Sequence, residues 1–543
     1  MRRAVSRLSG ETFDVLVLGG GITGACIARD ASKRGLSVAL IERRDFAGAT
    51  SANNSKLIHG GLRYLRNLEL RLVRESLGAR RIWQRIAPHL VHPLPFLVPL
   101  LHDGLFERAK LEAGLTLYDA LSYDRARLDD PYQRLPGHSW LGRNEAIAQE
   151  SVLGTEGLQG AFLYYDAQMY SPERLALECL IDADQEGAAV ANYVEAQALL
   201  VHYGAVAGCS AQDGISGDTF DIRARQTIVA AGPWTDLFLE KALHKPPACK
   251  LKRSKGIHIV VPSRTARHAL TVAAADTHFF VLPWRGHTIL GTTDTAFTGD
   301  PDAAGVREPD IAQFFDFMNR HLPTMALRRS EVEHFYAGLR PLVDDGSKDT
   351  YGASRRAEIV DHVQTDNLAG LVSVIGGKWT TSRELAEQVT DRILPKLGKS
   401  HRPCTTAAAR MPGGEIDDFL AFERSVAQEY PELQNIGHLV RQYGRALPAV
   451  LRQGAERPGL LQPIATTGDI GAQVIHAVQE EMAQTLEDVI LRRTGIGQLG
   501  APSPAELETV SRLMAQQLDW NEARRQAEIE ASRGVYRTAD GPG

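Results

Sequence analysis

Hydrophobic residues occupy all positions of residues 13–18 except Asp14, a short apolar run that is typical of a buried strand. After a glycine-rich turn, residues 22–34 carry apolar side chains at helical spacing, and Gly35 predicts the end of that helix. A second β-rich run follows at residues 37–41. The pattern therefore predicts a βαβ unit with two parallel strands.

Apolar runs with strand character recur downstream and alternate with helical stretches. They cover residues 227–231, 257–261, 279–282 and 371–375. Beyond Cys404 apolar residues recur every three or four positions, at Val474, Val478, Met482, Leu486, Ile490, Leu507, Val510 and Met514. We therefore predict a mixed α/β fold followed by a separate, all-helical C-terminal domain, with a loose tail from Arg533.

Composition narrows the class of protein. The chain has 543 residues, which at about 150 residues per domain suggests two to four domains. Its hydrophobic content of 43% and charged content of 23% are globular values. A net charge of −5 and the lack of a zinc-finger or basic-region pattern argue against nucleic acid as a partner.

Cysteine usage points to a reducing compartment. The cysteines are odd in number, scattered and without CxxC spacing, namely Cys26, Cys179, Cys209, Cys249 and Cys404. We therefore expect no disulfide framework and no metal site.

No stretch has the roughly 20 apolar residues that a membrane span requires. The longest candidate, residues 86–102, is interrupted by four prolines, and the arginine-rich start lacks the apolar core of a signal peptide. We therefore expect a cytoplasmic protein. Contact with a membrane surface stays open, because residues 68–86 predict a helix with an arginine stripe, although a solvated helix face explains that stripe equally simply. The stripe consists of Arg71, Arg74, Arg81 and Arg85.

The turn between the first strand and helix carries Gly19, Gly21 and Gly24 at GxGxxG spacing. Such glycines let the backbone approach a pyrophosphate, which binds the open N–H groups of the helix N-terminus. Glu42 follows the second strand, where a carboxylate accepts hydrogen bonds from ribose hydroxyls. Strand, glycines, helix, strand and acid together predict a dinucleotide site, whereas the glycines alone would also fit a tight-packing turn.

Two further segments favour a flavin over a nicotinamide. Residues 49–65 read ATSANNSKLIHGGLRYL, a loop whose hydroxyls can wrap a cofactor and whose cations and aromatics can reach the reactive ring. Residues 371–387 read LVSVIGGKWTTSRELAE, a strand, two glycines and a helix. The N–H groups of that helix suit a flavin's N1 and C2 carbonyl, where negative charge develops on reduction.

With these motifs, the sequence resembles the FAD-dependent glycerol-3-phosphate dehydrogenases from about Phe13 to about Gly497. Besides the two segments above, the matching stretches are GGGITGACIARDASKRGLSV, YYDAQM, AAGPWTD, SKGIHIVVP, ILGTTDTAFTGDP, AGLRPLVDD and LRRTGIG. The resemblance implies FAD as cofactor. The FAD-binding residues expected from it and from the glycine motifs are Gly19, Gly21, Gly24, Glu42, Thr50, Ser51, Ser55, Leu57, Val194, Gly232, Trp234, Gly377, Lys378 and Thr380.

The resemblance also implies an interleaved domain order. A Rossmann-like FAD domain is expected from residues 12–70, 191–250 and 361–400, and a mixed-sheet substrate domain from residues 71–190 and 251–360. The C-terminal helical domain is expected at residues 404–540.

A phosphorylated substrate carries about −1.5 to −2 charges, so several cations should converge on it. The family motifs assign this role to Arg63, Arg340, Arg355 and Lys378, with Tyr64 beside them. A loop arginine is ordinarily a surface residue, and Arg355 and Arg356 are interchangeable here. For the proton of the reacting hydroxyl, His59 and His258 are both candidate bases. Arg340 would stabilise charge on that oxygen, while Thr293 and Asp294 would organise the loops around the ring.

The resemblance predicts oxidation of sn-glycerol 3-phosphate to dihydroxyacetone phosphate by hydride transfer from C2 to the flavin N5, with two electrons passed to membrane quinone. It places the protein peripherally on the inner face of the cell membrane. It is also compatible with a homodimer. The alternatives within enzymes are an oxidase that uses oxygen and a dehydrogenase of another polyol phosphate. From another class, a flavin-binding redox sensor without catalysis would retain the cofactor motifs, but would have no need for a buried phosphate site.

Overall fold

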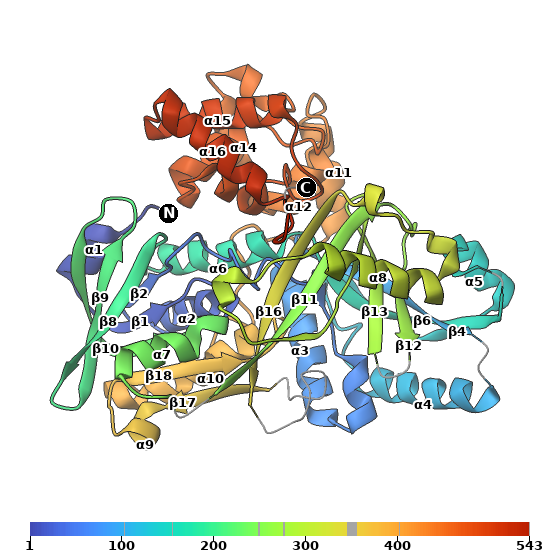
Figure 1. Ribbon diagram of the computed structural model, residues 1–543, viewed down its shortest axis with the longest axis horizontal. Coiled ribbons are helices and arrows are strands. Elements are labelled where there is room, and N and C mark those ends of the chain that lie inside the picture. The colour runs from blue at the N-terminus through green and yellow to red at the C-terminus, as the bar shows by residue number, and fades with distance from the viewer. Residues whose placement is uncertain are drawn as a thin grey trace.

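The computed structural model describes residues 1–101, 104–154, 156–247, 250–274, 277–344, 356–400 and 402–541. Two sheets lie side by side, and the C-terminal helices cover them from above in the view of Figure 1. The first sheet has the strand order β17-β18-β10-β1-β2-β7. Its strands are β1 (Thr12–Leu18), β2 (Val38–Ile41), β7 (Ala189–Ala191), β8 (Val194–His202), β9 (Ala205–Asp213), β10 (Thr219–Val229), β17 (Ala357–Asp361) and β18 (Leu371–Gly376). β9 pairs with both β8 and β10.

The predicted βαβ unit is confirmed. β1 pairs in parallel with both β2 and β10, and α2 (Ile22–Lys33) connects β1 to β2. Glycine is required where the backbones meet, since a Cβ on Gly24 would lie 1.9 Å from the Gly19 carbonyl oxygen. Gly19 itself has a φ of +115° and lies against the Ala230 carbonyl. These contacts fix the start of α2 at the carboxyl ends of the parallel strands.

The opposite face of α2 packs against two helices distant in sequence, α6 (Pro172–Gln185) and α10 (Ser382–Ile393). The helix interface is apolar and fully buried, with Ile27, Ala28 and Ala31 from α2. Small side chains on α2 allow both neighbours to approach closely.

The second sheet has the order β15-β11-β14-β13-β12-β4-β6-β3, and β16 pairs with β11. Its strands are β3 (Leu57–Ile58), β4 (Val91–Leu101), β5 (Ser139–Gly142), β6 (Leu158–Met169), β11 (Leu251–Pro262), β12 (Ala269–Ala274), β13 (Thr277–Trp284), β14 (His287–Gly291), β15 (Thr295–Phe297) and β16 (His334–Val343). β5 pairs with β6. Segments from both halves of the chain therefore share one sheet, joined where β12 pairs in parallel with β4. The helices α3 (Leu70–Ile86), α4 (Leu105–Leu121), α5 (Arg143–Gln149) and α8 (Glu308–His321) flank this sheet (Figure 1).

The proline-interrupted apolar run forms β4, which pairs with β6 along its length. Pro93, Pro95 and Pro99 share one parity, so their missing N–H groups fall on one edge of the strand. Among the described residues, no helix combines the length and the apolar character needed to cross a bilayer.

The predicted C-terminal helical domain is confirmed. It contains α11 (Phe419–Glu429), α12 (Ile436–Tyr443), α13 (Leu447–Leu451), α14 (Gly471–Glu481), α15 (Pro504–Leu518) and α16 (Glu522–Gly534). The repeat that starts at Val474 is split, because Met482 adopts a left-handed conformation and a π-helix follows at Asp488–Arg493. The prediction of a loose tail was wrong. Tyr536 donates a 2.8 Å hydrogen bond to the Gly497 carbonyl, and the Ala539 N–H donates one to the Val306 carbonyl.

A cluster of buried charged side chains joins this domain to the loop that follows β2. Asp45 follows β2 and is 2% exposed. Its carboxylate accepts hydrogen bonds of 2.7 and 2.8 Å from the Arg493 guanidinium and one of 2.6 Å from Arg492. The arginines hold the pKa of Asp45 below its usual range, despite the opposing effect of burial.

Replacing Asp45 with Asn should destabilise the protein by about 3 kcal/mol or more, because a buried charge pair loses one partner. Chemical denaturation followed by circular dichroism measures this loss. As a control, Glu11→Gln breaks the exposed pair with Arg7 and should leave the unfolding midpoint unchanged. Equal midpoints for Asp45→Asn and Glu11→Gln would contradict the assigned role of the cluster.

Candidate active site

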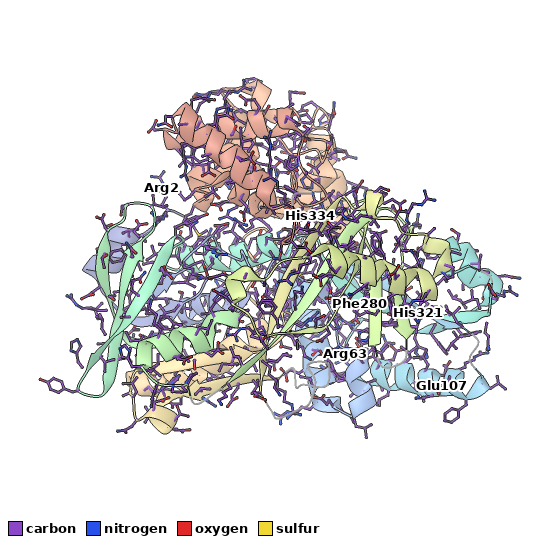
Figure 2. All side chains as sticks on the ribbon, viewed as in Figure 1. Arg2, Arg63, Glu107, Phe280, His321 and His334 are labelled. Atoms are coloured by element: carbon purple, nitrogen blue, oxygen red, sulfur yellow. The ribbon has the colours of Figure 1, made fainter. Side chains whose placement is uncertain are left out.

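One deep cavity of about 1450 Å³ lies between the two sheets. All the described residues predicted to bind FAD or substrate line it, except Gly24, which packs behind Gly19. Arg63 and Phe280, which both line the cavity, are labelled in Figure 2. Arg355 lies outside the described residues, so its predicted role stays a prediction.

At one end of the cavity, the N-terminus of α2 is open. Gly21 is the N-cap and supplies no side-chain cap, and the Ile22 N–H donates a 2.9 Å hydrogen bond to the Ser51 hydroxyl. A Cβ on Gly21 would lie 3.1 Å from that hydroxyl oxygen. The glycine therefore keeps a space that is bordered by N–H groups and a hydroxyl, which fits a pyrophosphate.

Glu42 lies beside this loop and is held by the backbone. Its carboxylate accepts hydrogen bonds from the Gly20 N–H at 2.8 Å and the Arg44 N–H at 3.0 Å. Burial raises the pKa of Glu42 although both hydrogen bonds lower it. A fixed acceptor at the end of β2 suits ribose hydroxyls, and the adjacent Val194 lines the same part of the cavity.

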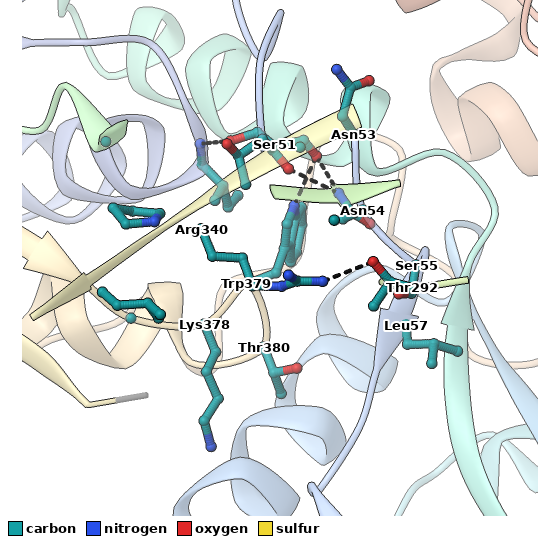
Figure 3. A pocket seen from close by; sticks show the side chains of 18 of the residues that line it. Ser51, Asn53, Asn54, Ser55, Leu57, Thr292, Arg340, Lys378, Trp379 and Thr380 are labelled. Atoms are coloured by element: carbon teal, nitrogen blue, oxygen red, sulfur yellow. Dashed lines mark hydrogen bonds between the residues drawn. The ribbon is translucent and has the colours of Figure 1, made fainter. Parts of the chain in front are cut away.

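The loop after Glu42 is anchored to distant segments. The Thr50 hydroxyl donates to the Leu339 carbonyl at 2.7 Å, and the Trp379 indole N–H donates to the Ser51 carbonyl at 3.1 Å. Figure 3 shows Trp379 reaching up to Ser51 between Arg340 and Thr380. The predicted cofactor residues Thr50 and Ser51 therefore have fixed positions. Ser55, also predicted to bind FAD, instead hydrogen-bonds the His258 Nε2 at 2.9 Å.

The segments of residues 49–65 and 371–387 meet at the cavity. Thr380 lies just before α10, and its hydroxyl accepts a 3.3 Å hydrogen bond from the His59 N–H. The Thr380 carbonyl accepts another of 2.9 Å from the buried Trp83 indole. Gly376 and Gly377, with φ of +71° and +93°, allow the turn that precedes α10. The helix N-terminus is thus set against the cavity, as a flavin's N1 and C2 carbonyl require.

A group of cations and aromatics occupies the cavity wall beyond this point. The Lys378 ammonium lies 4.0 Å from the centre of the Tyr64 ring and donates to the Ser76 hydroxyl at 3.0 Å. The Arg63 guanidinium lies 5.0 Å from the same ring. Burial lowers the pKa of Lys378. Burial, followed by the charges of Lys378 and Arg63, lowers the pKa of His59 to about 3.

Arg340 is held on another wall by neutral oxygens. Its guanidinium donates to the Thr292 hydroxyl at 2.8 Å and to the Ser254 hydroxyl at 3.1 Å (Figure 3). Its distance to the Asp294 carboxylate is 3.9 Å. Burial and the nearby charges of Arg340 and Lys56 hold the pKa of His258 well below its usual range. Both candidate histidines are therefore neutral at physiological pH and able to accept a proton.

Sequence reasoning missed several contributors to this wall. Ser76, Ser254 and Thr292 hold the cations, and Lys56 supports the His258 region through an ion pair of 2.7 Å with Glu173. Thr292 lies in the GTTD motif, Ser254 opens the SKGIHIVVP stretch and Lys56 lies in the segment of residues 49–65, whereas Ser76 lies in none of the matching stretches. Among the described residues, no cluster of potential metal ligands occurs.

Residues 14–392 match the family described as FAD dependent oxidoreductase, and residues 404–525 match the C-terminal domain of alpha-glycerophosphate oxidase. The chain belongs to the FAD dependent oxidoreductase family. The predicted cofactor, FAD, and the predicted family resemblance are thereby confirmed, while the roles of the single site residues stay predictions.

Relatives of this oxidoreductase extend over nearly its whole length. A glycerol-3-phosphate dehydrogenase of Synechocystis sp. is 36% identical over 91% of this chain and 90% of its own. The mitochondrial glycerol-3-phosphate dehydrogenase of Mesocricetus auratus is 34% identical over 96% of this chain and 72% of its own. The solved structure of the glycerol-3-phosphate dehydrogenase from Bacillus halodurans complexed with FAD superposes with a TM-score of 0.78 at 27% identity, covering 99% and 97% of the two chains.

Gly21→Val should yield a folded oxidoreductase with little bound flavin, because the branched side chain occupies the space beside Ser51. The φ of −72° at Gly21 is accessible to valine, so the backbone itself should tolerate the change. Visible absorbance measures flavin content and circular dichroism measures folding. Gly10→Val, at a glycine with no neighbouring atom within 4 Å, is the control and should retain flavin. A full flavin complement in Gly21→Val would refute the pyrophosphate assignment.

Proposed function

We propose that this protein oxidises sn-glycerol 3-phosphate to dihydroxyacetone phosphate and passes the two electrons to a membrane quinone. The observation that carries the proposal is the meeting of cations and neutral histidines in the cavity that holds the flavin motifs. FAD, when bound, accepts the hydride from C2 of the substrate. The relatives named glycerol-3-phosphate dehydrogenase support the same substrate.

Lys378 and Arg63 suit the phosphate. Among the described residues, the atoms in contact with the Lys378 ammonium belong to a ring and a hydroxyl, and no carboxylate neutralises it. A phosphate dianion offers charge-assisted hydrogen bonds that a serine hydroxyl cannot match. Binding would therefore draw Lys378 from Ser76 towards the substrate. Both cations lie against the Tyr64 ring.

A neutral histidine then accepts the proton of the C2 hydroxyl. His59 is adjacent to the phosphate cations, and its low pKa keeps the imidazole unprotonated before substrate binds. The phosphate neutralises the cations that lower this pKa, so substrate binding makes His59 more basic at the moment of proton transfer. His258 stacks on Tyr336 at 5.0 Å and hydrogen-bonds Ser55, which makes it the second candidate.

Arg340 suits the reacting oxygen. Its guanidinium is fixed by Thr292 and Ser254, so it needs little reorganisation as negative charge develops on that oxygen. A contact that strengthens as the hydroxyl loses its proton lowers the barrier more than it tightens substrate binding.

An oxidase that reduces oxygen is the second candidate, because residues 404–525 match the C-terminal domain of alpha-glycerophosphate oxidase. The quinone acceptor is favoured by the relatives named dehydrogenases. Because a quinone resides in the membrane, we also propose that the protein is located peripherally on the inner face of the cell membrane. For its oligomeric state we propose a homodimer. Another polyol phosphate would use the same cations, whereas a redox sensor without catalysis leaves them unexplained.

The proposed function is tested by adding glycerol 3-phosphate to the purified holoenzyme without oxygen. We expect bleaching of the flavin absorbance, followed by rapid recovery with a quinone and slow recovery with air. Unphosphorylated glycerol should bleach the flavin far more slowly, because it lacks the group that the cations bind. Equal bleaching by both compounds would refute the substrate assignment, and faster recovery with air than with quinone would favour the oxidase.

Lys378→Ala and Arg340→Ala should each lower kcat/KM while FAD binding and folding persist. A charge-assisted contact contributes roughly 1.5 to 3 kcal/mol, so the loss should be about ten- to over a hundredfold. Lys378→Ala should act mostly through KM, as expected of a ground-state phosphate contact. Arg340→Ala should also lower kcat, because its oxygen partner gains charge only in the transition state.

Steady-state kinetics with a soluble dye acceptor measures both effects. Lys399→Ala removes a surface lysine that pairs with Asp14 and should leave both constants unchanged. Unchanged kinetics in Lys378→Ala would move the phosphate site elsewhere in the cavity.

A further inference from the structure

An apolar surface lies on the edge of the molecule opposite the C-terminal helices. α4 forms this lower edge in Figure 1, and Glu107 marks its position in Figure 2. Leu105 and Phe106 are 82% and 77% exposed, and Leu117 is 36% exposed. Leu68, 76% exposed, immediately follows the short helix at Leu62–Asn67 that contacts α4. Exposed apolar side chains so concentrated mark an interaction surface.

The apolar residues of α4 form a continuous stripe. Phe106, Ala109, Ala113, Leu117 and Ala120 follow one another at spacings of three and four residues and are all exposed. The opposite face is fixed in the protein, because Leu115 and Tyr118 are buried and the Tyr118 hydroxyl donates to Asp166 at 2.9 Å. The stripe is therefore presented outwards by a helix whose position is set.

The charges around the stripe favour an anionic partner. The carboxylates of α4 have intramolecular cationic or imidazole partners: Glu107 pairs with Lys110, and Glu112 and Asp119 both contact His138. By contrast, Arg71 on the neighbouring α3 and Arg127 are exposed without a carboxylate partner in the described part of the chain. Arg127 lies over Tyr123, which follows α4 and is 62% exposed.

Of the arginine stripe considered from the sequence, only Arg71 belongs to this surface. Arg74 and Arg81 both pair with Asp124, and Arg85 donates to the Ala407 carbonyl. These three guanidinium groups serve the fold. Leucine and phenylalanine flanked by tyrosine and free arginine are instead the composition of an element that lies in a lipid interface.

We propose that the outer face of α4, with Leu68 and Tyr123, docks on an anionic lipid bilayer. The proposal rests on the quinone acceptor of the proposed function and explains how that acceptor reaches the flavin. The inner side of α4 forms part of the cavity wall through Lys110, Leu111 and Gly114. Docking by the outer face therefore sets the cavity wall at the membrane surface, where a lipid-soluble quinone is concentrated.

The test is flotation of the holoenzyme with vesicles of phosphatidylethanolamine and phosphatidylglycerol. The parent protein should float with them. Phe106→Ser/Leu117→Ser should lower the vesicle partition coefficient by about tenfold or more, because two side chains lose their apolar insertion. Leu420→Ser is the matched control for Leu117→Ser, since both leucines are helical and 36% exposed but Leu420 lies on α11. It should float as the parent does.

A second variant tests the contribution of charge to binding. It also keeps the proposal testable if the double variant misfolds. Arg71→Gln should weaken binding to these vesicles and leave any binding to neutral phosphatidylcholine vesicles unchanged. Flavin content and dye reduction with glycerol 3-phosphate establish that each variant is folded, because neither Phe106 nor Leu117 lines the cavity. Quinone embedded in vesicles should be reduced more slowly by the double variant than by the parent.

The proposal is overturned if the parent does not float or if the double variant floats equally well. It is also overturned if the double variant turns a dimer into a monomer without changing flotation, since the stripe is then a subunit interface. Failure of the parent to oxidise glycerol 3-phosphate with the dye would overturn the proposed function instead, and flotation would still test the surface.

Discussion

The site depends on one electrostatic constraint: cations that are to meet an anionic substrate must be kept in a partly buried cavity before that substrate arrives. Neutral oxygens and rings meet this constraint. Lys378 lies between Tyr64 and Ser76, and Arg340 is held by Thr292 and Ser254. Such partners satisfy the donors yet compete weakly with phosphate or a developing oxyanion. A carboxylate in direct contact with Lys378 would have stabilised the resting state at the expense of substrate binding. The Asp294 carboxylate lies 3.9 Å from Arg340 and accepts a hydrogen bond from Ser254.

The scaffold makes these positions possible by bringing separate segments to one place. The close packing of Gly19 and Gly24 sets the N-terminus of α2, and the buried Asp45 cluster fixes the following loop to the C-terminal domain. Hydrogen bonds from Trp379 to Ser51 and from His59 to Thr380 then join the segment of residues 371–387 to that of residues 49–65. The C-terminal domain therefore stabilises the cofactor loop although it lies away from the reacting groups.

The two halves of the proposed reaction make different demands on the same cavity. Substrate oxidation needs fixed cations and a neutral base, which the walls around His59 and Arg340 provide. Electron delivery to a quinone needs access from an apolar phase, for which the exposed side of α4 is suited. Because α4 also forms part of the cavity wall, the proposed docking would connect the membrane surface with the site of chemistry through one helix.

The sequence by itself determined the βαβ unit and the helical C-terminal domain, because hydrophobic periodicity and glycine spacing are local properties that the backbone obeys directly. The FAD family followed from the resemblance of its motifs to those of known relatives. It also indicated the motifs that line the cavity. Only the tertiary structure decided which neutral oxygens hold Lys378 and Arg340, that Arg74 and Arg81 of α3 pair with Asp124, and that the C-terminal tail is bound. These contacts join positions as much as 302 residues apart, as for Lys378 and Ser76. Local spacing carries no information about such partners, since they meet only when the two sheets and their helices pack together.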